Sequence, residues 1–323
     1  MMPKPCLHQE CLRQNNSKRM LCGVLAFIIL LLAPPASAWN ATGHRIIAAI
    51  AYDRLTPAAR TKVDEMIRNH PDYNRLFVIG APEEPSARAR YAFQYAATWP
   101  DVIRGDMRFY DETRKDFMET PLLPGFTSMS RHVVWHYYDI PHAPDGAKKK
   151  LQLPPHALSE LRRMLSDLGK LDAAHAAYDL PWLEHLEGDV HQPLHATSRF
   201  LKAQPMGDAG GNFVFVAPNS NLHAYWDNAA GTDTTDSFID RSAKEIATEF
   251  PGTGGLNLNP NRWLKESYSL DKSEVYSFGL ATGTREQPIT LPSDYAEKAK
   301  KIARRRLAEA GYRLAEILNQ SLK

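Results

Sequence analysis

The sequence predicts an all-α protein: a single compact multi-helix domain with one small β-hairpin. Apolar residues recur at helical spacing through much of the chain, and several segments carry residues typical of helix N-termini. Only residues 212–216 read convincingly as a strand, which we expect to be one arm of the hairpin. No internal repeat and no long linker divides residues 39–323, so we expect one domain there.

The expected helices can be justified in chain order. A first helix follows Gly43-His44, and Thr56-Pro57 supplies an N-cap with proline at the first helical position of a second helix, which ends near Asn69. Pro154-Pro155 opens a later helix that has four apolar residues at helical spacing. The remaining helices are expected at about residues 87–98, 172–191, 222–227, 235–250, 260–269, 272–282 and 292–320. Residues 71–86, 104–130 and 196–211 are expected to be irregular, and residues 131–139 to be a short strand or a buried turn.

Residues 1–38 are expected to be a cleaved signal peptide. Lys18-Arg19 precedes an apolar run over residues 20–33 that is too short to span a membrane, and Ala36-Ser37-Ala38 fits a cleavage signal. We therefore expect a secreted or periplasmic protein that begins at Trp39 and has no stable membrane association. The short run and the small residues after it disfavour the alternative, an uncleaved anchor.

Charge and cysteine content narrow the class of protein. The whole chain has a formal net charge of +2, but the leader carries four basic residues against one acidic residue, which leaves about −1 for residues 39–323. No overall basic field therefore attracts a polyanion. All three cysteines also lie in the leader. The exported chain must be stabilised by core burial or by metal, and not by disulfides.

The segment Trp182 to His195 concentrates possible metal ligands. It predicts the end of a helix on which His185 and Asp189, four residues apart, share one face. Pro193 then stops the regular helix, and His195 follows where the chain must turn. Imidazole and carboxylate are ligands that zinc prefers. Taken alone, histidines near a helix end are also common as surface caps.

Further candidates flank this segment, and each has an ordinary structural alternative. Trp39 could be a core aromatic residue, Asp101 a turn residue or helix cap, and His136 a buried core histidine. The joint occurrence of all candidates favours a metal site. In chain order they are Trp39, His44, Asp101, His136, His185, Asp189, His195, His223 and Asp227.

In this order the residues resemble the zinc-dependent single-strand nucleases of the S1/P1 type, whose superfamily also contains bacterial zinc phospholipases C. The resemblance covers nearly all of residues 39–323. It is carried by the motifs Gly43-His44, Trp99-Pro100-Asp101-x-x-Arg104, His136-Tyr-Tyr-Asp139, His185-x3-Asp189-x5-His195, Gly210-Gly-Asn212 and His223-x3-Asp227.

The resemblance implies three zinc ions. One would be bound by Asp101, His136, His185 and Asp189, and a second by His195, His223 and Asp227. The third would be bound by His44, by Asp189 and by the α-amine and carbonyl oxygen of Trp39. Asp189 would thus bridge two ions, and cleavage before Trp39 would create one ligand.

The resemblance also implies the reaction and its residues. Asp101 would orient the nucleophile and Arg104 would stabilise the transition state, while Tyr137, Asp139 and Asn212 would contact the substrate. From the residues alone, Tyr137 could equally be a core aromatic residue, and Gly210-Gly-Asn212 could be an ordinary turn. The expected activity is hydrolysis of single-stranded DNA or RNA to 5′-phosphorylated products, with removal of the 3′-phosphate from nucleotides. The substrates are then single-stranded nucleic acid and nucleotides, and we expect a monomer.

Two alternatives remain open. A phospholipase C on the same scaffold would be expected to have glutamate where this chain has Asp227. A structural or zinc-scavenging protein would have no use for Arg104. The chain also departs from the fungal and plant pattern, because residues 196–209 lengthen the loop after His195 and leave the second wall of the base pocket undefined.

Overall fold

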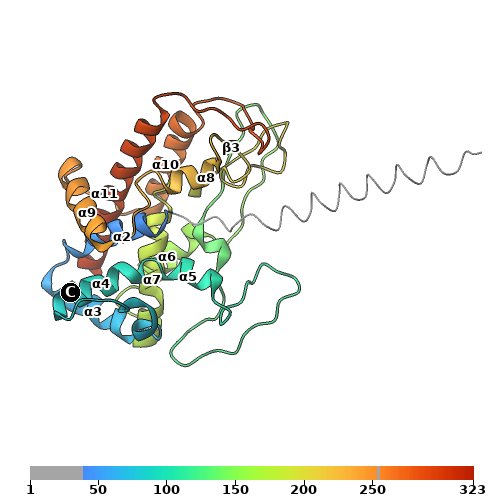
Figure 1. The fold of residues 1–323 in the computed structure, drawn as a ribbon. Coiled ribbons are helices and arrows are strands. Elements are labelled where there is room, and N and C mark those ends of the chain that lie inside the picture. The colour runs from blue at the N-terminus through green and yellow to red at the C-terminus, as the bar shows by residue number, and fades with distance from the viewer. Residues whose placement is uncertain (1–38, 253–254) are drawn as a thin grey trace, which may run out of the picture. The chain divides into compact units, whose positions relative to one another are not determined.

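The computed structural model describes residues 39–252 and 255–323, and the predicted leader lies outside these ranges. Helices dominate the described residues and the sheets are small, which confirms the predicted fold class (Figure 1). The α-helices are α2 (Ala41–Tyr52), α3 (Pro57–Asn69), α4 (Pro85–Ala96), α5 (Trp99–Val102), α6 (Ala157–Asp167), α7 (Ala173–Asp189), α8 (Leu222–Asp227), α9 (Asp236–Glu249), α10 (Pro260–Leu270) and α11 (Tyr295–Ser321). Short 3₁₀ and π turns supplement them: η1 (Tyr73–Phe77), η2 (Ile103–Gly105), η3 (Val133–His136), η4 (Pro193–His195) and η5 (Asp271–Val275).

Side-chain caps start the helices that carry the candidate ligands. Asn40 accepts a hydrogen bond from the backbone N–H of Gly43 at the start of α2, one residue before His44. Asp172 accepts from two backbone N–H groups at the start of α7. Asn221 accepts from Ala224 and begins α8, which carries His223. Each cap satisfies backbone donors that the helix itself leaves free and so fixes where the first turn begins.

Helix α7 is the central element of the fold. It contacts α2, α3, α5, α6 and α11, and every residue from Ala177 to Asp189 is buried. The helix continues through Pro181. Because neighbours cover all its faces, the histidine and carboxylate side chains near its C-terminal end cannot reach bulk water. They must find their partners inside the protein.

Two small sheets complete the fold. Strand β3 (Phe215–Val216) pairs antiparallel with β4 (Ser220–Asn221) in the expected hairpin, but the strand covers only the last two of the predicted residues 212–216, because a turn occupies the first of them. A second, parallel pair joins β1 (Ile140–His142) to β2 (Thr197–Arg199). The sequence predicted a loop over residues 196–211, and strands of three residues are too short to show a periodicity of two.

The structure differs from the sequence prediction in two more places. Residues 272–282 were expected to be a helix, but η5 ends at Val275 and turns follow, with Gly279 at a φ of +80°. A positive φ is incompatible with a continuing right-handed helix, so the prediction was wrong beyond the first turn. Residues 131–139 are neither a strand nor a simple turn, because they contain η3 followed by extended chain.

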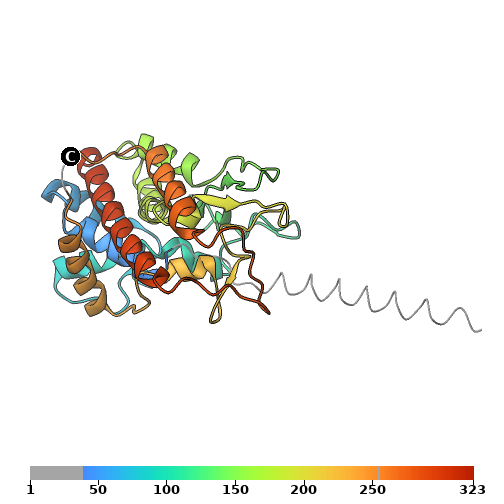
Figure 2. The ribbon, with the colours of Figure 1, turned by 90° about the horizontal axis from the view of Figure 1, so that it is seen from above.

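The main hydrophobic core lies where α2, α3, α7 and α11 meet. Helix α11 packs along α2, as both ribbon views show (Figures 1 and 2). Trp99 and Trp182 are fully buried, with ring centroids 6.1 Å apart in an edge-to-face arrangement. A second, smaller cluster surrounds Trp226 and Tyr276. In the described ranges, no helix combines the length and the apolar character needed to cross a membrane.

Candidate metal centre and substrate pocket

The structure brings eight of the predicted ligand side chains into three groups. The groups are His44 with His185 and Asp189, Asp101 with His136 and His185, and His195 with His223 and Asp227. Within each group the ligand atoms lie within 4.8 Å of one another. They come from α2, α5, η3, α7, η4 and α8, so segments distant in sequence converge at the C-terminal end of α7.

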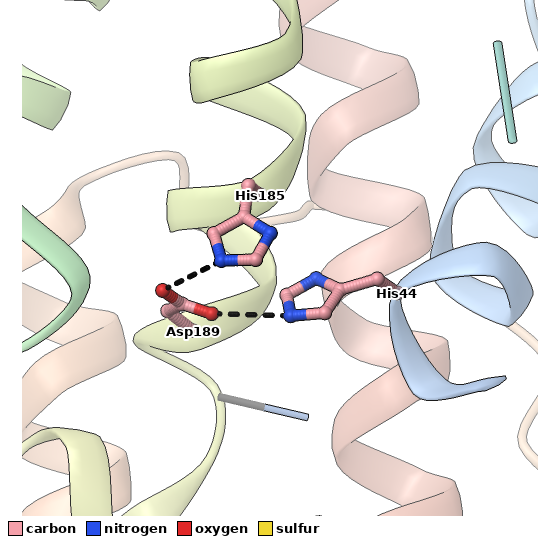
Figure 3. A group of neighbouring side chains, drawn as sticks. All are labelled: His44, His185 and Asp189. Carbon is pink, nitrogen blue, oxygen red and sulfur yellow. Dashed lines mark ion pairs between the residues drawn. The ribbon is translucent and has the colours of Figure 1, made fainter. Parts of the chain in front are cut away.

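Asp189 links two of these groups. Its Oδ1 lies 3.3 Å from Nε2 of His44, and its Oδ2 lies 3.4 Å from Nε2 of His185 (Figure 3). The same Oδ2 lies 3.3 Å from Nδ1 of His136. The side chain is fully buried. Its two oxygens therefore face different histidines, which is the arrangement that a bridging carboxylate requires.

Backbone carbonyl oxygens set the orientation of three of the imidazole rings. Nδ1 of His185 lies 2.8 Å from the carbonyl oxygen of Ala97, and Nδ1 of His195 lies 2.7 Å from that of His136. Nδ1 of His223 lies 2.6 Å from the carbonyl oxygen of Gly210. A carbonyl oxygen can only accept, so each Nδ1 is the protonated nitrogen. In a neutral ring this leaves the lone pair on Nε2, facing the site.

Nitrogen atoms of neighbouring rings approach each other closely in two places. Nε2 of His195 lies 3.0 Å from Nε2 of His223, and Nδ1 of His136 lies 3.0 Å from Nε2 of His185. Burial, reinforced by the charge of His223, holds the pKa of His195 well below its ordinary value, so this ring is neutral. Two neutral rings of this tautomer would turn lone pairs toward each other. A cation between them removes that repulsion.

The carboxylates also fit a cation. Burial raises the pKa of Asp189 well above its ordinary value, with a further contribution from Asp101, and burial does the same for Asp227. A buried carboxylate keeps its negative charge only beside a positive partner. Gln192 donates a hydrogen bond of 2.7 Å to Oδ1 of Asp227, which leaves Oδ2 at 3.6 Å from Nε2 of His223. The donor set of imidazoles and carboxylates is of the kind that binds zinc.

Close packing places His44 and Trp39 beside these groups. The His44 ring stacks on His185 with centroids 3.9 Å apart, and a Cβ on Gly188 would lie 3.0 Å from Nδ1 of His44. Trp39 is fully buried, and the next residue, Asn40, approaches the carbonyl oxygen of Asp227 with its N–H at 3.4 Å. The start of the domain thus lies next to Asp227, a candidate ligand in the group with His195 and His223. The ligand role of the Trp39 amine stays a prediction.

Asp101 and Arg104 mark the open side of the site. Oδ1 of Asp101 lies 3.9 Å from the facing nitrogens of both His136 and His185. Arg104 donates a hydrogen bond of 3.4 Å to this same oxygen. The Asp101 side chain is 18% exposed and that of Arg104 is 10% exposed, whereas Asp189 is completely buried. A substrate therefore approaches from the side of Asp101 and Arg104.

A cavity of about 370 Å³ contains two of the predicted substrate residues, Tyr137 and Asp139, and Tyr137 directly follows the candidate ligand His136 in the chain. Phe200 and Met206, from the long loop after His195, form part of its wall. Burial, and secondarily the charge of Asp208, raises the pKa of Asp139 to about 7. Two residues of the segment 196–209 therefore line this cavity, and a role of the cavity in binding a base stays a prediction.

Asn212, the third predicted substrate residue, lies elsewhere. Its side-chain amide donates to the carbonyl oxygen of Ala209 at 2.8 Å and so stabilises its own turn. In that turn Gly210 has a φ of +60°, and a Cβ there would lie 2.6 Å from the carbonyl oxygen of Leu194. Position 210 therefore requires glycine, and the carbonyl oxygen of Gly210 is the one that orients His223.

Several buried polar residues near the candidate ligands in sequence were given no role by the sequence analysis. The side chain of Gln192 holds Asp227. His191 is fully buried and accepts a hydrogen bond of 2.7 Å from Arg313. Glu184 and Glu187 are buried on α7, and burial raises the pKa of both well above the ordinary value. Helical spacing could not reveal this, because α7 is covered on every side.

Comparison with known proteins finds one matching family model and several similar proteins. The family model described as S1/P1 Nuclease matches residues 39–323. Endonuclease 1 of Arabidopsis thaliana is 23% identical over 331 residues, covering 95% of this chain and 94% of its own. Endonuclease 4 of the same plant is 32% identical over 161 residues, covering 44% of this chain. Nuclease S1 of Aspergillus oryzae (strain ATCC 42149 / RIB 40) is 26% identical over 162 residues, covering 43% of this chain. The chain spans only about half the length of the latter two relatives, 49% and 53% respectively.

Proposed function

Because this chain belongs to the S1/P1 nuclease family, we propose that it is a zinc-dependent nuclease. It hydrolyses phosphodiester bonds of single-stranded DNA or RNA to 5′-phosphorylated products, and it removes the 3′-phosphate from nucleotides. The observation that carries this proposal is the 3.0 Å approach of Nε2 of His195 to Nε2 of His223 beside a buried carboxylate. Such a contact suits rings that share a cation.

Three zinc ions fit the proposed ligands. One is held by Asp101, His136, His185 and Asp189, one by His195, His223 and Asp227, and one by His44, Asp189 and the amine and carbonyl oxygen of Trp39. The two oxygens of Asp189, each 3.3 Å from a different histidine, support its bridging role. Zinc in such sites supplies Lewis acidity and an activated water at neutral pH.

Asp101 and Arg104 act on the reacting phosphate. Asp101, at the open side, orients the attacking water, and Arg104 donates hydrogen bonds to the phosphate oxygens as negative charge develops on them. Their mutual contact of 3.4 Å fixes the guanidinium next to the metal groups before the substrate arrives. A structural zinc protein has no need of an arginine at this position.

The cavity beside Tyr137 and Asp139 accounts for the preference for single strands. A base can stack on the Tyr137 ring only when it is unpaired, and such stacking contributes about 1–3 kcal/mol with little sequence preference. Asp139 accepts or donates a hydrogen bond at the base edge, according to its protonation. Asn212 remains a predicted phosphate contact.

The protein is proposed to act as a monomer outside the cytoplasm. The predicted leader ends at the residue before Trp39, and the match to the family model begins at Trp39. Both observations support a mature chain whose first residue is a zinc ligand. Secretion is tested by N-terminal sequencing of the protein exported by its own host, with Trp39 expected as the first residue.

The proposal is tested with purified protein that begins at Trp39. The protein is treated with a chelator and then assayed, with and without added zinc, on single-stranded DNA, duplex DNA and a 3′-nucleotide. We expect zinc-dependent cleavage of the single strand and the nucleotide and much slower cleavage of the duplex. Stoichiometric zinc without any phosphodiesterase activity would contradict the proposal.

One observation supports phospholipase C as a second candidate. The side chains of Leu151, Leu153 and Met206 line the cavity at Tyr137 and are 59%, 75% and 84% exposed. Exposed apolar side chains at the rim of a site can enter a lipid surface. Phosphatidylcholine vesicles are therefore included in the assay. Cleavage of the lipid head group without cleavage of nucleic acid would favour this candidate.

A further inference from the structure

The cavity at Tyr137 continues into a run of three lysines. Lys150 lines the cavity, and Lys148 and Lys149 precede it in a segment that is neither helix nor strand. All three residues are exposed. A strand held by one base at Tyr137 therefore passes a row of ammonium groups as soon as it leaves the cavity.

These lysines form no ion pairs, whereas several other basic residues in the described part of the chain do. Within residues 39–252 and 255–323, no carboxylate forms an ion pair with Lys148, Lys149 or Lys150. On α11, by contrast, Lys298 pairs with Asp294 at 2.7 Å and Arg304 pairs with Glu249 at 2.8 Å. The charge of the lysine run is not neutralised internally.

Two further observations place the run beside other basic residues and beside the long loop. Burial is the main cause of the lowered pKa of His142, and Lys272, Arg199 and Lys149 lower it further, so these three cations surround the end of β1. The backbone N–H of Lys202 donates a hydrogen bond of 2.8 Å to Asp145, which ties the long loop to the segment that leads into the run. Lys149 therefore lies near two further cations, Lys272 and Arg199, while the carboxylate of Asp271 lies 4.0 Å from Nδ1 of His142 in the same part of the protein.

We propose that Lys148 and Lys149 bind backbone phosphates of a polynucleotide next to the nucleotide held at Tyr137, and so make the protein favour strands over mononucleotides. This inference rests on the proposed nuclease function and specifies its substrate. Phosphate contacts by lysine are independent of sequence, as are contacts by stacking. A mononucleotide bound at Tyr137 has no phosphate that reaches the run, so it gains nothing from these residues.

The test compares two double variants with the same change in charge. Lys148→Gln/Lys149→Gln removes the proposed contacts but leaves Lys150 in the cavity wall. Lys300→Gln/Lys301→Gln removes two consecutive exposed lysines from α11 and serves as the control. Binding of a fluorescein-labelled 20-nucleotide single strand is measured by anisotropy with chelated protein over a range of salt concentrations. KM is then measured with zinc for the same strand and for a 3′-mononucleotide.

We expect the Lys148/Lys149 variant to bind the strand about tenfold more weakly at low salt. The dependence of log K on log salt should become less steep by about 1.4, because each phosphate contact to a single strand contributes about 0.7. KM should rise for the strand and change less than twofold for the mononucleotide. The control variant should behave like the wild-type protein.

Three outcomes would overturn the inference: equal losses for both substrates, equal losses in both variants, or unchanged strand binding. Unchanged strand binding together with lost sedimentation on phosphatidylserine vesicles would assign the run to lipid instead. Failure of the nuclease proposal is distinguishable, because strand binding is measured without catalysis. A wild-type protein that binds the strand through these lysines but cleaves nothing would disprove the function and retain the contact.

Discussion

His195 and His223 turn their Nε2 atoms toward each other at 3.0 Å, while the Nδ1 of each donates to a backbone carbonyl oxygen. The two rings therefore compete for no proton and are prepared to share a cation. Asp227 lies beside them, held by Gln192. The arrangement orients the ligands before the ion arrives, which lowers the cost of ordering them on binding.

Replacing Gln192 with alanine should weaken metal binding by the group of His195, His223 and Asp227. The change leaves Oδ1 of Asp227 without its donor, and loss of a group that orients a metal ligand commonly reduces metal affinity or activity about 10- to 100-fold. Zinc affinity is measured by competition with a chelator of known affinity. Gln320→Ala, on the exposed face of α11, is the control and should change nothing.

Asp189→Asn and His44→Asn should differ in the number of ions lost. Because Asp189 is proposed to bridge two ions, its replacement should remove about two zinc ions per chain. His44 contacts only one oxygen of that carboxylate, so its replacement should remove one. Zinc content is measured by mass spectrometry after dialysis. Equal losses in the two variants would show that Asp189 does not bridge.

A methionine placed before Trp39 should remove one zinc ion and most of the activity. The extension converts the proposed amine ligand into an amide, whose nitrogen lone pair is delocalised into the carbonyl group. Activity and zinc content are compared with the protein that begins at Trp39, and a single methionine added after Lys323 controls for the extra residue. Equal activity in the two N-terminal forms would exclude Trp39 from the site.

Arg104→Gln should reduce kcat about 10²- to 10³-fold without loss of zinc, because it removes a donor that acts on the transition state. Arg104→Lys should restore little, since lysine lacks the planar pair of donors. Steady-state kinetics and zinc content are measured on the same samples. Arg114→Gln, in an exposed ion pair with Asp116, is the control. A matching fall in zinc content would make Arg104 a structural residue.

Asp139→Asn should stabilise the protein at high pH. Burial raises the pKa of Asp139 to about 7 from 3.8, so as the pH rises the unfolded chain releases this proton before the folded protein does. The contribution of Asp139 to stability is therefore full below about pH 4 and is lost as the pH rises to about 7. The benefit of the variant should grow by roughly 1.4 kcal/mol per pH unit in that range and then level off. Urea unfolding of chelated protein at pH 5 and pH 8 measures it, and an equal benefit at both values would contradict the burial argument.

The sequence predicted the helices better than the other elements. The cap at Thr56 with Pro57 marks the start of α3 at the right residue, because cap chemistry is local. Strands β1 and β2 escaped prediction because pairing of Ile140 with Thr197 joins segments distant in sequence. The helix that was wrongly predicted over residues 272–282 rested on helical composition. In the structure the helical conformation ends at Val275 despite that local preference.

In the candidate site, too, local features could be predicted from the sequence and long-range contacts could not. Residue types alone pointed to His185, Asp189 and His195, because few side chains can bind a metal. The sequence could not show which carbonyl oxygens orient the rings, since every residue has one. Nor could it show that Phe200 and Met206 would form the wall of the cavity at Tyr137, because this depends on how a long loop folds back.

The main-chain anchors of the histidine rings have a consequence for protein engineering. The carbonyl oxygens of Ala97 and His136 persist whatever side chains are chosen nearby, and only Gly210 is restricted by its backbone conformation. Residues 202–206, which are exposed or half-buried, can therefore be varied in a combinatorial library while the anchors are retained, whereas the neighbouring Arg199, Gly207 and Asp208 are buried and are best kept. If the proposed roles hold, such a library would change the wall of the cavity without touching the candidate metal ligands.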